Sequence, residues 1–227
     1  MSLLGVIFDF DGVIADTERL HLRAFQQVLS GGPLTLTDEA YDARYLGYDD
    51  AGVFTAVAAD HGRRLAPGEL ARMVAAKGRR YDDLVKAGQV VFPDAPRCIE
   101  RLAADAILGI ASGALHGEIE AILVGAGLRG HFSAIVAADD VERSKPAPDS
   151  YNQAVELLCV ELGRPPSPSG FVAIEDSRWG IEAATAAGLP CVGVTTSYGA
   201  QDLPGAALIV PRLAELDLDA LATLCRS

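Results

Sequence analysis

The chain has 227 residues, half of them hydrophobic, and a formal net charge of −12 at pH 7. This length suits one large domain or a core domain with an insertion, and the apolar share excludes global disorder. The excess of acids argues against non-specific binding to nucleic acid or to an anionic membrane surface.

The four cysteines lie far apart without a CxxC pair, and the four histidines show no zinc-ligand spacing. Free thiols in a reducing compartment are therefore expected. No charged and apolar leader precedes the first apolar run, and no run reaches membrane-spanning length. We expect a soluble cytoplasmic protein, monomeric or, as the alternative, dimeric.

The first predicted strand, residues 4–10, ends in Asp9 and Asp11, which are followed at once by Gly12. Residues two apart in a strand point the same way, so both carboxylates lie together at its C-terminal end. Two like charges this close need a cation, and Mg²⁺ prefers such oxygen ligands. An aspartate beside the ion can also attack phosphorus as a nucleophile. Taken alone, the pattern also fits a buried strand whose polar end reaches solvent.

The next 90 residues hold helical patterns and no strand pattern. The helices are expected at residues 17–29, 37–44, 49–61 and 67–86. We predict an all-helical inserted domain over residues 16–92, and a core domain formed by residues 1–15 and 93–227.

Strands and helices alternate in the rest of the chain. The expected strands are residues 106–111, 134–137, 171–174, 191–194 and 207–210, and the expected helices are 95–104, 117–125, 148–162 and 178–187. The strands are apolar throughout, as in sheets covered on both faces. The fold class is therefore α/β, with a Rossmann-like doubly wound parallel sheet that binds ligands at the C-terminal strand ends. Trp179 is expected to pack between the last of these helices and the sheet.

Polar residues follow several of the predicted strands. Ser112 and Gly113 end the second strand, Lys145 lies beyond the third, and Glu175 and Asp176 end the fourth. In a parallel sheet all of them meet Asp9 at one edge. Phosphoryl transfer requires this combination of a nucleophile, an acidic metal site, a hydroxyl and an ammonium group.

The expected roles follow from the chemistry of each side chain. Mg²⁺ is held by Asp9, Asp176 and the backbone carbonyl of Asp11, with Glu175 on the metal or its waters. Lys145 screens Asp9 from the incoming phosphate, and Ser112 with nearby N–H groups binds a phosphate oxygen. Asp11 serves as the general acid and then as the general base.

At this point the chain resembles the haloacid dehalogenase superfamily of phosphotransferases. The matching motifs are FDFDGVIADT at 8–17, ASG at 111–113, SKPAPD at 144–149 and IEDSRWG at 174–180. They occur in the family's order and cover nearly the whole chain. The resemblance implies nucleophile Asp9, acid/base Asp11, phosphate ligands Ser112 and Lys145, and metal ligands Asp9, Asp11 and Asp176. The insertion resembles the helical cap of the family's first cap class.

The resemblance leaves two activities open. A Mg²⁺-dependent phosphatase of a small phosphorylated metabolite, acting through an aspartyl-phosphate, is the favoured one. A β-phosphoglucomutase-like sugar phosphate mutase is the alternative, because the mutases also have counterparts of His21 and Lys77. The mutases place basic residues where this chain has Leu46 and Asp50, on either side of the group's cap-loop glycine, Gly47. A mutase binds a second phosphate, so these missing cations favour the phosphatase.

The residues expected to contact substrate are Gly113 in the core and His21, Arg44, Gly47 and Lys77 in the insertion. His21, Arg44 and Lys77 also have a simpler interpretation, as ordinary or solvated helix residues. Two other classes of protein are weighed against the enzyme. Signalling receiver modules are shorter and lack a helical insertion. A catalytically silent relative would have no reason to retain the four residues Asp9, Asp11, Lys145 and Asp176.

Overall fold

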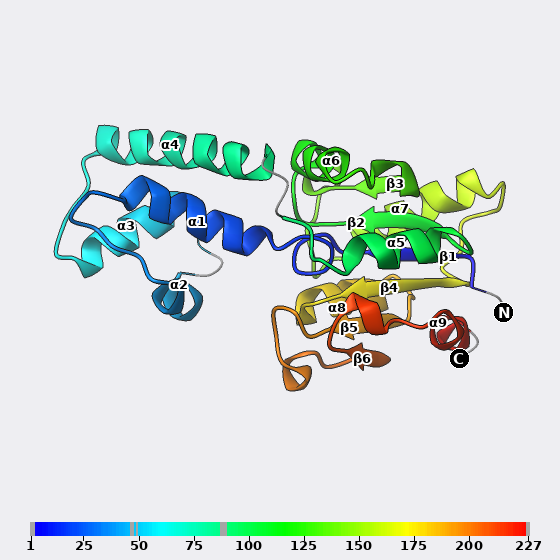
Figure 1. Cartoon of the computed structure of the whole chain (residues 1–227). Coiled ribbons are helices and arrows are strands. Elements are labelled where there is room, and N and C mark those ends of the chain that lie inside the picture. The colour runs from blue at the N-terminus through cyan, green and yellow to red at the C-terminus, as the bar shows by residue number, and fades with distance from the viewer. Residues whose placement is uncertain (1–2, 46–47, 49, 87–89, 226–227) are drawn as a thin grey trace. The chain divides into compact units, whose positions relative to one another are not determined.

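A computed structural model describes residues 3–45, 48, 50–86 and 90–225 (Figure 1). The chain divides into two compact units. The core unit comprises Met1–Asp16 and Val91–Ser227, and the helical unit comprises Thr17–Val90. The two points at which the chain passes from one unit to the other lie within two residues of the predicted boundaries. That the two units act as a catalytic core and a substrate-selecting cap stays a prediction.

A six-stranded sheet of parallel strands forms the centre of the core unit, in the order β3-β2-β1-β4-β5-β6. The strands are β1 (Gly5–Phe8), β2 (Ile107–Ala111), β3 (Phe132–Val136), β4 (Phe171–Glu175), β5 (Cys191–Val194) and β6 (Leu208–Val210). Side chains on both faces of β1 and β4 are fully buried, which explains why these segments are apolar without alternation. The predicted α/β fold class is confirmed.

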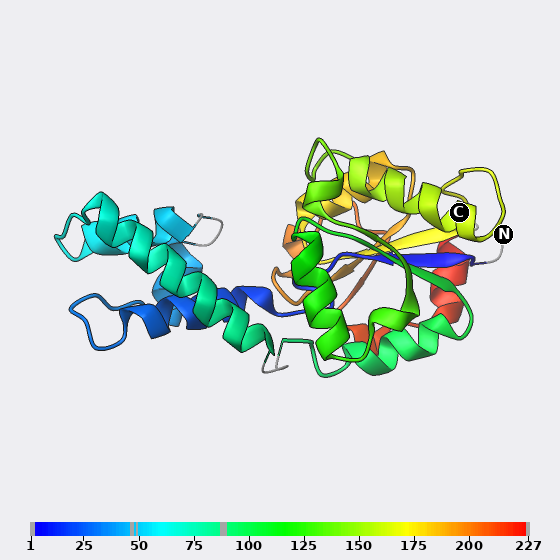
Figure 2. The ribbon, with the colours of Figure 1, turned by 90° about the horizontal axis from the view of Figure 1, so that it is seen from above.

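Helices cover both faces of the sheet (Figure 2). They are α5 (Ala95–Ala103), α6 (His116–Gly125), α7 (Asp149–Glu161), α8 (Arg178–Ala186) and α9 (Leu218–Leu224). Helices α7 and α8 contact each other on one face, and α5 packs on the other. The chain adds β2 and β3 on one side of β1 and then returns to add β4, β5 and β6 on the other side, so the strand order reverses between β1 and β4. Ligands of such sheets bind at this reversal, between the ends of β1 and β4.

The helical unit has a hydrophobic core of its own. It consists of α1 (Thr17–Leu29), α2 (Asp38–Arg44), α3 (Asp50–Asp60) and α4 (Pro67–Lys86), and its described residues include no strand. Helices α1 and α4 pack along each other, and Phe25 meets Phe54 edge to face with ring centroids 5.1 Å apart. Buried residues from α1, α2 and α3 complete this core, which includes no residue of the sheet.

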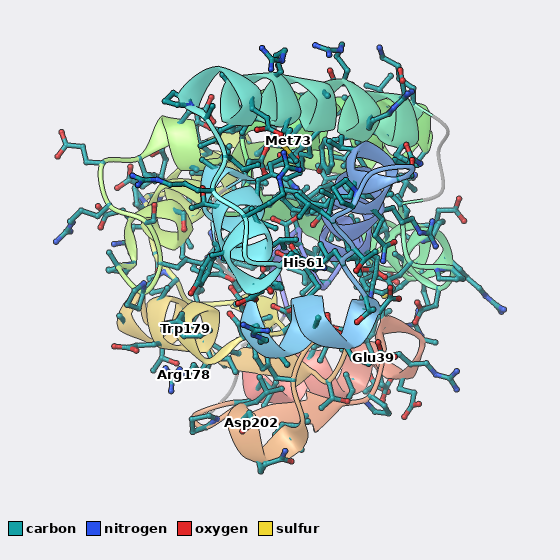
Figure 3. All side chains as sticks on the ribbon, turned by 90° about the vertical axis from the view of Figure 1, so that its left-hand side faces the viewer. Glu39, His61, Met73, Arg178, Trp179 and Asp202 are labelled. Atoms are coloured by element: carbon teal, nitrogen blue, oxygen red, sulfur yellow. The ribbon has the colours of Figure 1, made fainter. Side chains whose placement is uncertain are left out.

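The core unit differs from the sequence-based prediction in two places. Helix α9, of only seven residues, is not among the predicted helices. Trp179 does not pack between α8 and the sheet: its side chain is 42% exposed and lies beside the Arg178 guanidinium, 4.5 Å from the ring centroid (Figure 3). The reason is its position in the first turn of α8, next to Gly180, whereas Ile181 and Ala184 provide the buried face. Within the described residues, no helix combines the length and the hydropathy that a membrane crossing needs.

Candidate active site

The turn after β1 positions the two aspartates of the first motif. The Asp9 amide donates to the Ile174 carbonyl at 2.9 Å, which extends the pairing of β1 with β4 by one residue. The Gly12 amide donates to the Ala15 carbonyl at 2.8 Å and closes the turn around Asp11. Gly12 has φ +74°, and a Cβ placed on it would lie 1.8 Å from Oδ2 of Asp176. Glycine is therefore required by both the backbone and the close approach of Asp176.

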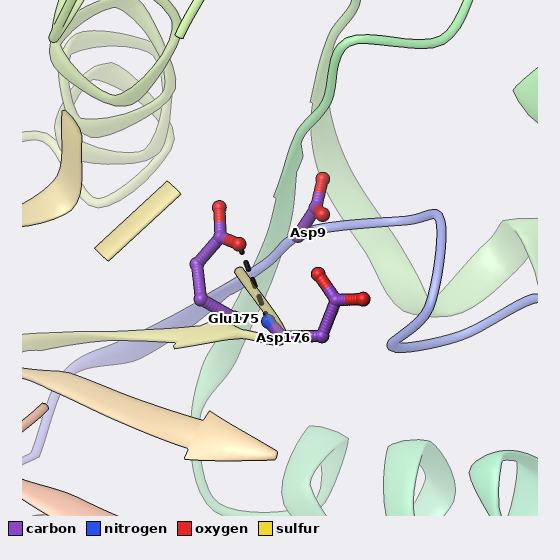
Figure 4. A group of neighbouring side chains, drawn as sticks. All are labelled: Asp9, Glu175 and Asp176. Carbon is purple, nitrogen blue, oxygen red and sulfur yellow. Dashed lines mark hydrogen bonds between the residues drawn. The ribbon is translucent and has the colours of Figure 1, made fainter. Parts of the chain in front are cut away.

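Three carboxylates from two neighbouring strands meet at this edge of the sheet. Asp9, Glu175 and Asp176 each offer one oxygen, and these oxygens lie within 4.8 Å of one another (Figure 4). The three residues are at most 8% exposed. They meet because β1 and β4 are hydrogen-bonded neighbours, although more than 160 residues separate them in the sequence. Clustered carboxylate oxygens are the donor set that Mg²⁺ takes, so these residues fit a small divalent cation.

Burial and mutual repulsion alter the proton affinity of two of these acids. Burial, followed by the charge of Asp9, raises the pKa of Glu175 to about 7, although Lys145 acts in the opposite direction. The same two causes raise the pKa of Asp176 to about 8, against the hydrogen bond from Ser197. A bound cation would relieve this repulsion, which is a second reason to assign a cation to the cluster.

Lys145 supplies the positive charge of the cluster. Its Nζ donates to Oδ1 of Asp9 at 2.8 Å and to Oε1 of Glu175 at 2.6 Å. Burial alone would lower the pKa of Lys145, but the charges of Asp9 and Glu175 outweigh it and raise the pKa above its ordinary value. Lys145 is thus a fixed cation beside the predicted nucleophile, where it can neutralise the charge of an incoming phosphoryl group.

Protein donors hold both oxygens of Glu175. Oε1 accepts from Lys145 and from the Tyr151 hydroxyl, at 2.8 Å, and Oε2 accepts from the Asp176 amide at 3.3 Å and the Ser177 hydroxyl at 3.4 Å. A Cβ on Gly180 would lie 1.9 Å from the Glu175 carboxyl carbon, so the first turn of α8 closes over the carboxylate. Both oxygens of Glu175 are therefore engaged by protein donors, and one of them orients Lys145.

Ser112 and Gly113 lie at the C-terminal end of β2, beside β1. Ser112 is 2% exposed, its amide donates to the Val136 carbonyl at 2.9 Å, and its Oγ accepts from the Ala114 amide at 3.0 Å. A Cβ on Gly113 would meet no atom within 4 Å, so this position opens onto free space. The sheet therefore brings the second motif to the same edge as Asp9, as the sequence predicts.

Three residues that contribute polar groups to the site were not identified from the sequence: Tyr151, Thr196 and Ser197. Ser197 donates its hydroxyl to Oδ2 of Asp176, and Thr196 donates its hydroxyl to the Gly12 carbonyl. Tyr151 is fully buried on α7, and its hydroxyl donates to Glu175, in keeping with the tendency of a buried tyrosine hydroxyl to find a partner. The loop that holds Thr196 and Ser197 carries no motif, so only the strand order reveals its role.

In the helical unit, His21, Lys77 and Asp50 form a compact polar cluster. The Lys77 ammonium donates to Oδ1 of Asp50 at 2.8 Å and to Nδ1 of His21 at 2.5 Å, and the His21 ring stacks on Tyr81. Burial, and then the charge of Lys77, lower the pKa of His21 to about 4, so the ring is neutral. Lys77 is 3% exposed, so its interpretation as a solvated helix residue is wrong.

Arg44, another residue predicted to contact substrate, pairs with Asp60 and with no member of that cluster in the ion pairs of the described residues. Arg44 ends α2 and forms an ion pair with Asp60 at 2.5 Å, with its side chain 55% exposed. Gly47 lies outside the described residues, so its predicted role is not addressed by the structure.

Comparisons with known proteins agree with this architecture. Residues 6–194 match the family described as haloacid dehalogenase-like hydrolase. The chain is 32% identical to Protein CbbY of Rhodobacter capsulatus over 87% of this chain and 88% of that protein. It is 33% identical to the fructose-1-phosphate phosphatase YqaB of Escherichia coli over 84% of this chain and 95% of that one. A crystal structure of a CbbY mutant from Rhodobacter sphaeroides with xylulose 1,5-bisphosphate has a TM-score of 0.71 and 29% identity, covering 94% and 96% of the two chains.

Proposed function

Because the chain belongs to the haloacid dehalogenase-like hydrolase family, we propose that it hydrolyses a small phosphate monoester in two steps through phosphorylated Asp9. The single observation that carries this proposal is the buried constellation of Asp9, Lys145 and Asp176 at one edge of the sheet. It supplies a nucleophile, a fixed cation and a cation site in one place.

The first step transfers the phosphoryl group to the protein. A carboxylate oxygen of Asp9 attacks phosphorus, and the bond between phosphorus and the ester oxygen of the leaving alcohol breaks. Lys145 and the Ser112 hydroxyl stabilise the equatorial oxygens, and Asp11 gives its proton to the departing alcohol oxygen.

The second step regenerates the carboxylate. Asp11, now ionised, removes a proton from a water molecule, whose oxygen attacks phosphorus. The bond between phosphorus and the Asp9 oxygen breaks, and inorganic phosphate leaves. Asp9 and Asp176, together with the backbone carbonyl of Asp11, would hold Mg²⁺, which supplies charge neutralisation and alignment of the phosphoryl group when bound.

The helical unit is proposed to act as a cap that selects the substrate, with His21 and Arg44 as its polar contacts. The pairing of Lys77 with Asp50 supports a phosphatase over a mutase, because a mutase needs spare positive charge for a second phosphate. The relatives named above suggest the substrate class. Fructose 1-phosphate and xylulose 1,5-bisphosphate are both ketose 1-phosphates, and we propose that this chain accepts one of this class.

The proposal is tested by phosphate release from a panel of phosphate monoesters with and without Mg²⁺. The panel holds fructose 1-phosphate, xylulose 1,5-bisphosphate and phosphoglycolate, with ³¹P NMR to detect isomerisation. We expect Mg²⁺-dependent release that Asp9→Asn abolishes and Asp105→Asn, at an exposed turn before β2, leaves unchanged. Release by folded Asp9→Asn would disprove the nucleophile, and interconversion of sugar phosphates without release would favour the mutase.

A further inference from the structure

Two neighbouring hydroxyls fasten the loop after β5 to the cation site. Thr196 donates to the Gly12 carbonyl, and Ser197 donates to Oδ2 of Asp176. The loop is thereby bound to both segments that would hold the ion, the turn after β1 and the end of β4. In the hydrogen bonds that the described residues make, Ser197 contacts Asp176 and neither Asp9 nor Lys145.

These contacts occupy one oxygen of Asp176. A Cβ on Gly12 would lie 1.8 Å from Oδ2 of Asp176 and 2.6 Å from Oγ of Ser197, so Oδ2 is enclosed between the turn and the serine. Figure 4 shows one carboxylate oxygen of Asp176 turned toward Asp9 and the other turned away. Among the hydrogen bonds of the described residues, Oδ2 of Asp176 accepts from Ser197 and Oδ1 accepts none, so Oδ1 is the oxygen left open to a cation.

The other carboxylates of the cluster are restricted in the same way. Oδ1 of Asp9 accepts from Lys145 at 2.8 Å, which leaves one oxygen for an ion. Both oxygens of Glu175 accept from protein donors. No carboxylate of this cluster, as the described residues arrange it, is set to bind an ion through both oxygens at once.

Binding through one oxygen of each carboxylate suits Mg²⁺ better than Ca²⁺, because the two ions differ in coordination. Mg²⁺ takes six ligands in a near-ideal octahedron, keeps several waters and binds carboxylates through single oxygens. Ca²⁺ takes six to eight oxygens at longer distances and often binds a carboxylate through both. A site whose aspartates each offer one oxygen favours the smaller ion.

We propose that Ser197 makes Asp176 a one-oxygen ligand and thereby determines the preference of the cation site for Mg²⁺ over Ca²⁺. Lys145 imposes the same restriction on Asp9, but it also serves the phosphoryl group, whereas Ser197 acts only through Asp176. Ser197 is a positioning residue, and its role rests on the proposed cation site and on no particular substrate.

The test is isothermal titration of the whole chain with Mg²⁺ and with Ca²⁺, without substrate, for the unaltered protein and Ser197→Ala. The quantity compared is the ratio of the two dissociation constants, Ca²⁺ over Mg²⁺. Removal of a group that orients a metal ligand changes metal affinity by about 10- to 100-fold. We expect the ratio to fall about 10-fold in Ser197→Ala, through weaker Mg²⁺ binding, tighter Ca²⁺ binding or both.

Two further variants sharpen the result. Ser197→Thr keeps the hydroxyl and should retain the ratio of the unaltered protein within about twofold. Ser30→Ala removes a hydroxyl that donates to the Gln27 carbonyl in the helical unit, and should change neither constant. Circular dichroism verifies the fold of each variant, and the exposed position of Ser197 makes Ser197→Ala a mild change.

Three results would overturn the inference. An unchanged ratio in Ser197→Ala, or equal weakening of both ions, would show that Ser197 does not select between them. Loss of the preference in Ser197→Thr as well would show that the hydroxyl is not responsible. If the unaltered protein bound neither ion, the cation site itself would be wrong, and Mg²⁺-independent phosphate release would then show whether the rest of the proposed function stands.

Discussion

At Gly180 the absence of a side chain decides where the Glu175 carboxylate can lie. A Cβ at this position would come within 2.0 Å of the carboxyl carbon and both carboxylate oxygens. The carboxylate cannot move aside cheaply, because it is fully buried and four donors hold it. The packing of the first turn of α8 against Glu175, and with it the orientation of Lys145, therefore requires glycine at position 180.

Gly180→Ala should lower the free energy of unfolding by about 1–3 kcal/mol, the usual cost of overpacking, and should reduce phosphate release at least tenfold. Gly117→Ala is the matched control: it also lies in the first turn of a core helix, but its added Cβ would meet no atom within 4 Å. It should leave stability equal or higher by a few tenths of a kcal/mol, since alanine favours helix. Urea unfolding and a phosphate assay check both variants, and equal behaviour of the two would refute the steric argument.

At the scale of elements, the N-terminus of α8 serves both the helix and the cluster. Ser177 is its N-cap: Oγ accepts from the Gly180 amide at 3.1 Å and donates to Oε2 of Glu175 at 3.4 Å. One hydroxyl thus satisfies an amide that the helix leaves unpaired and a carboxylate of the site. Helix formation and placement of Glu175 are parts of the same local structure.

Ser177→Ala should therefore lose both stability and activity. We expect the free energy of unfolding to fall by about 1–2 kcal/mol, as for other N-caps, and turnover to fall several-fold. The control is Asp217→Ala, which removes the N-cap acceptor of α9, bonded to the Asp219 amide at 3.4 Å. It should lose a similar or smaller free energy while retaining turnover. Undiminished turnover in Ser177→Ala would show that the hydroxyl acts on the helix alone.

At the scale of the whole molecule, the acid cluster links folding to pH. The pKa values of Glu175 and Asp176 rise from 4.5 and 3.8 to about 7 and about 8 in the folded chain. Between these limits the folded chain binds more protons than the unfolded chain, so stability falls as pH rises. His21 has the opposite sign, because its pKa falls from 6.5 to about 4, but the unfolded chain holds only half a proton on it at pH 6.5 and less above that pH.

Stability is therefore best measured between pH 6.5 and 8, where the effect of the two acids exceeds that of His21. With a chelator present, the free energy of unfolding should fall across this interval, because the folded acids lose protons that the unfolded chain has already lost. With saturating Mg²⁺ the fall should be smaller, since the ion compensates the charges, and Mg²⁺ affinity should rise with pH. Urea unfolding at several pH values measures both, with Asp176→Asn as the variant that should flatten the curve. A flat or rising curve for the unaltered chain in chelator would contradict the shifts.

The sequence predicted the strands and the site residues that directly follow them. Continuous apolar runs predict strands buried on both faces, and the parallel sheet brings Asp9, Ser112, Lys145 and Asp176 to one edge. The sequence did not predict the exposure of Trp179 or the burial of Lys77, because each depends on which neighbours its helix contacts in the folded chain. Ser197 was also out of reach, since its approach to Gly12 follows from the packing of the β5 loop against the turn after β1.

The exposure of Trp179 also has a practical consequence. It is the only tryptophan of the chain, it is 42% exposed, and it lies three residues after Asp176, in the helix turn that encloses Glu175. Its indole emission is therefore a built-in optical reporter of this turn. Because the ring already meets solvent in the folded chain, unfolding should shift its emission little. A change in emission intensity on adding a cation or phosphate would then report binding at the C-terminal edge of the sheet, in real time and without a label.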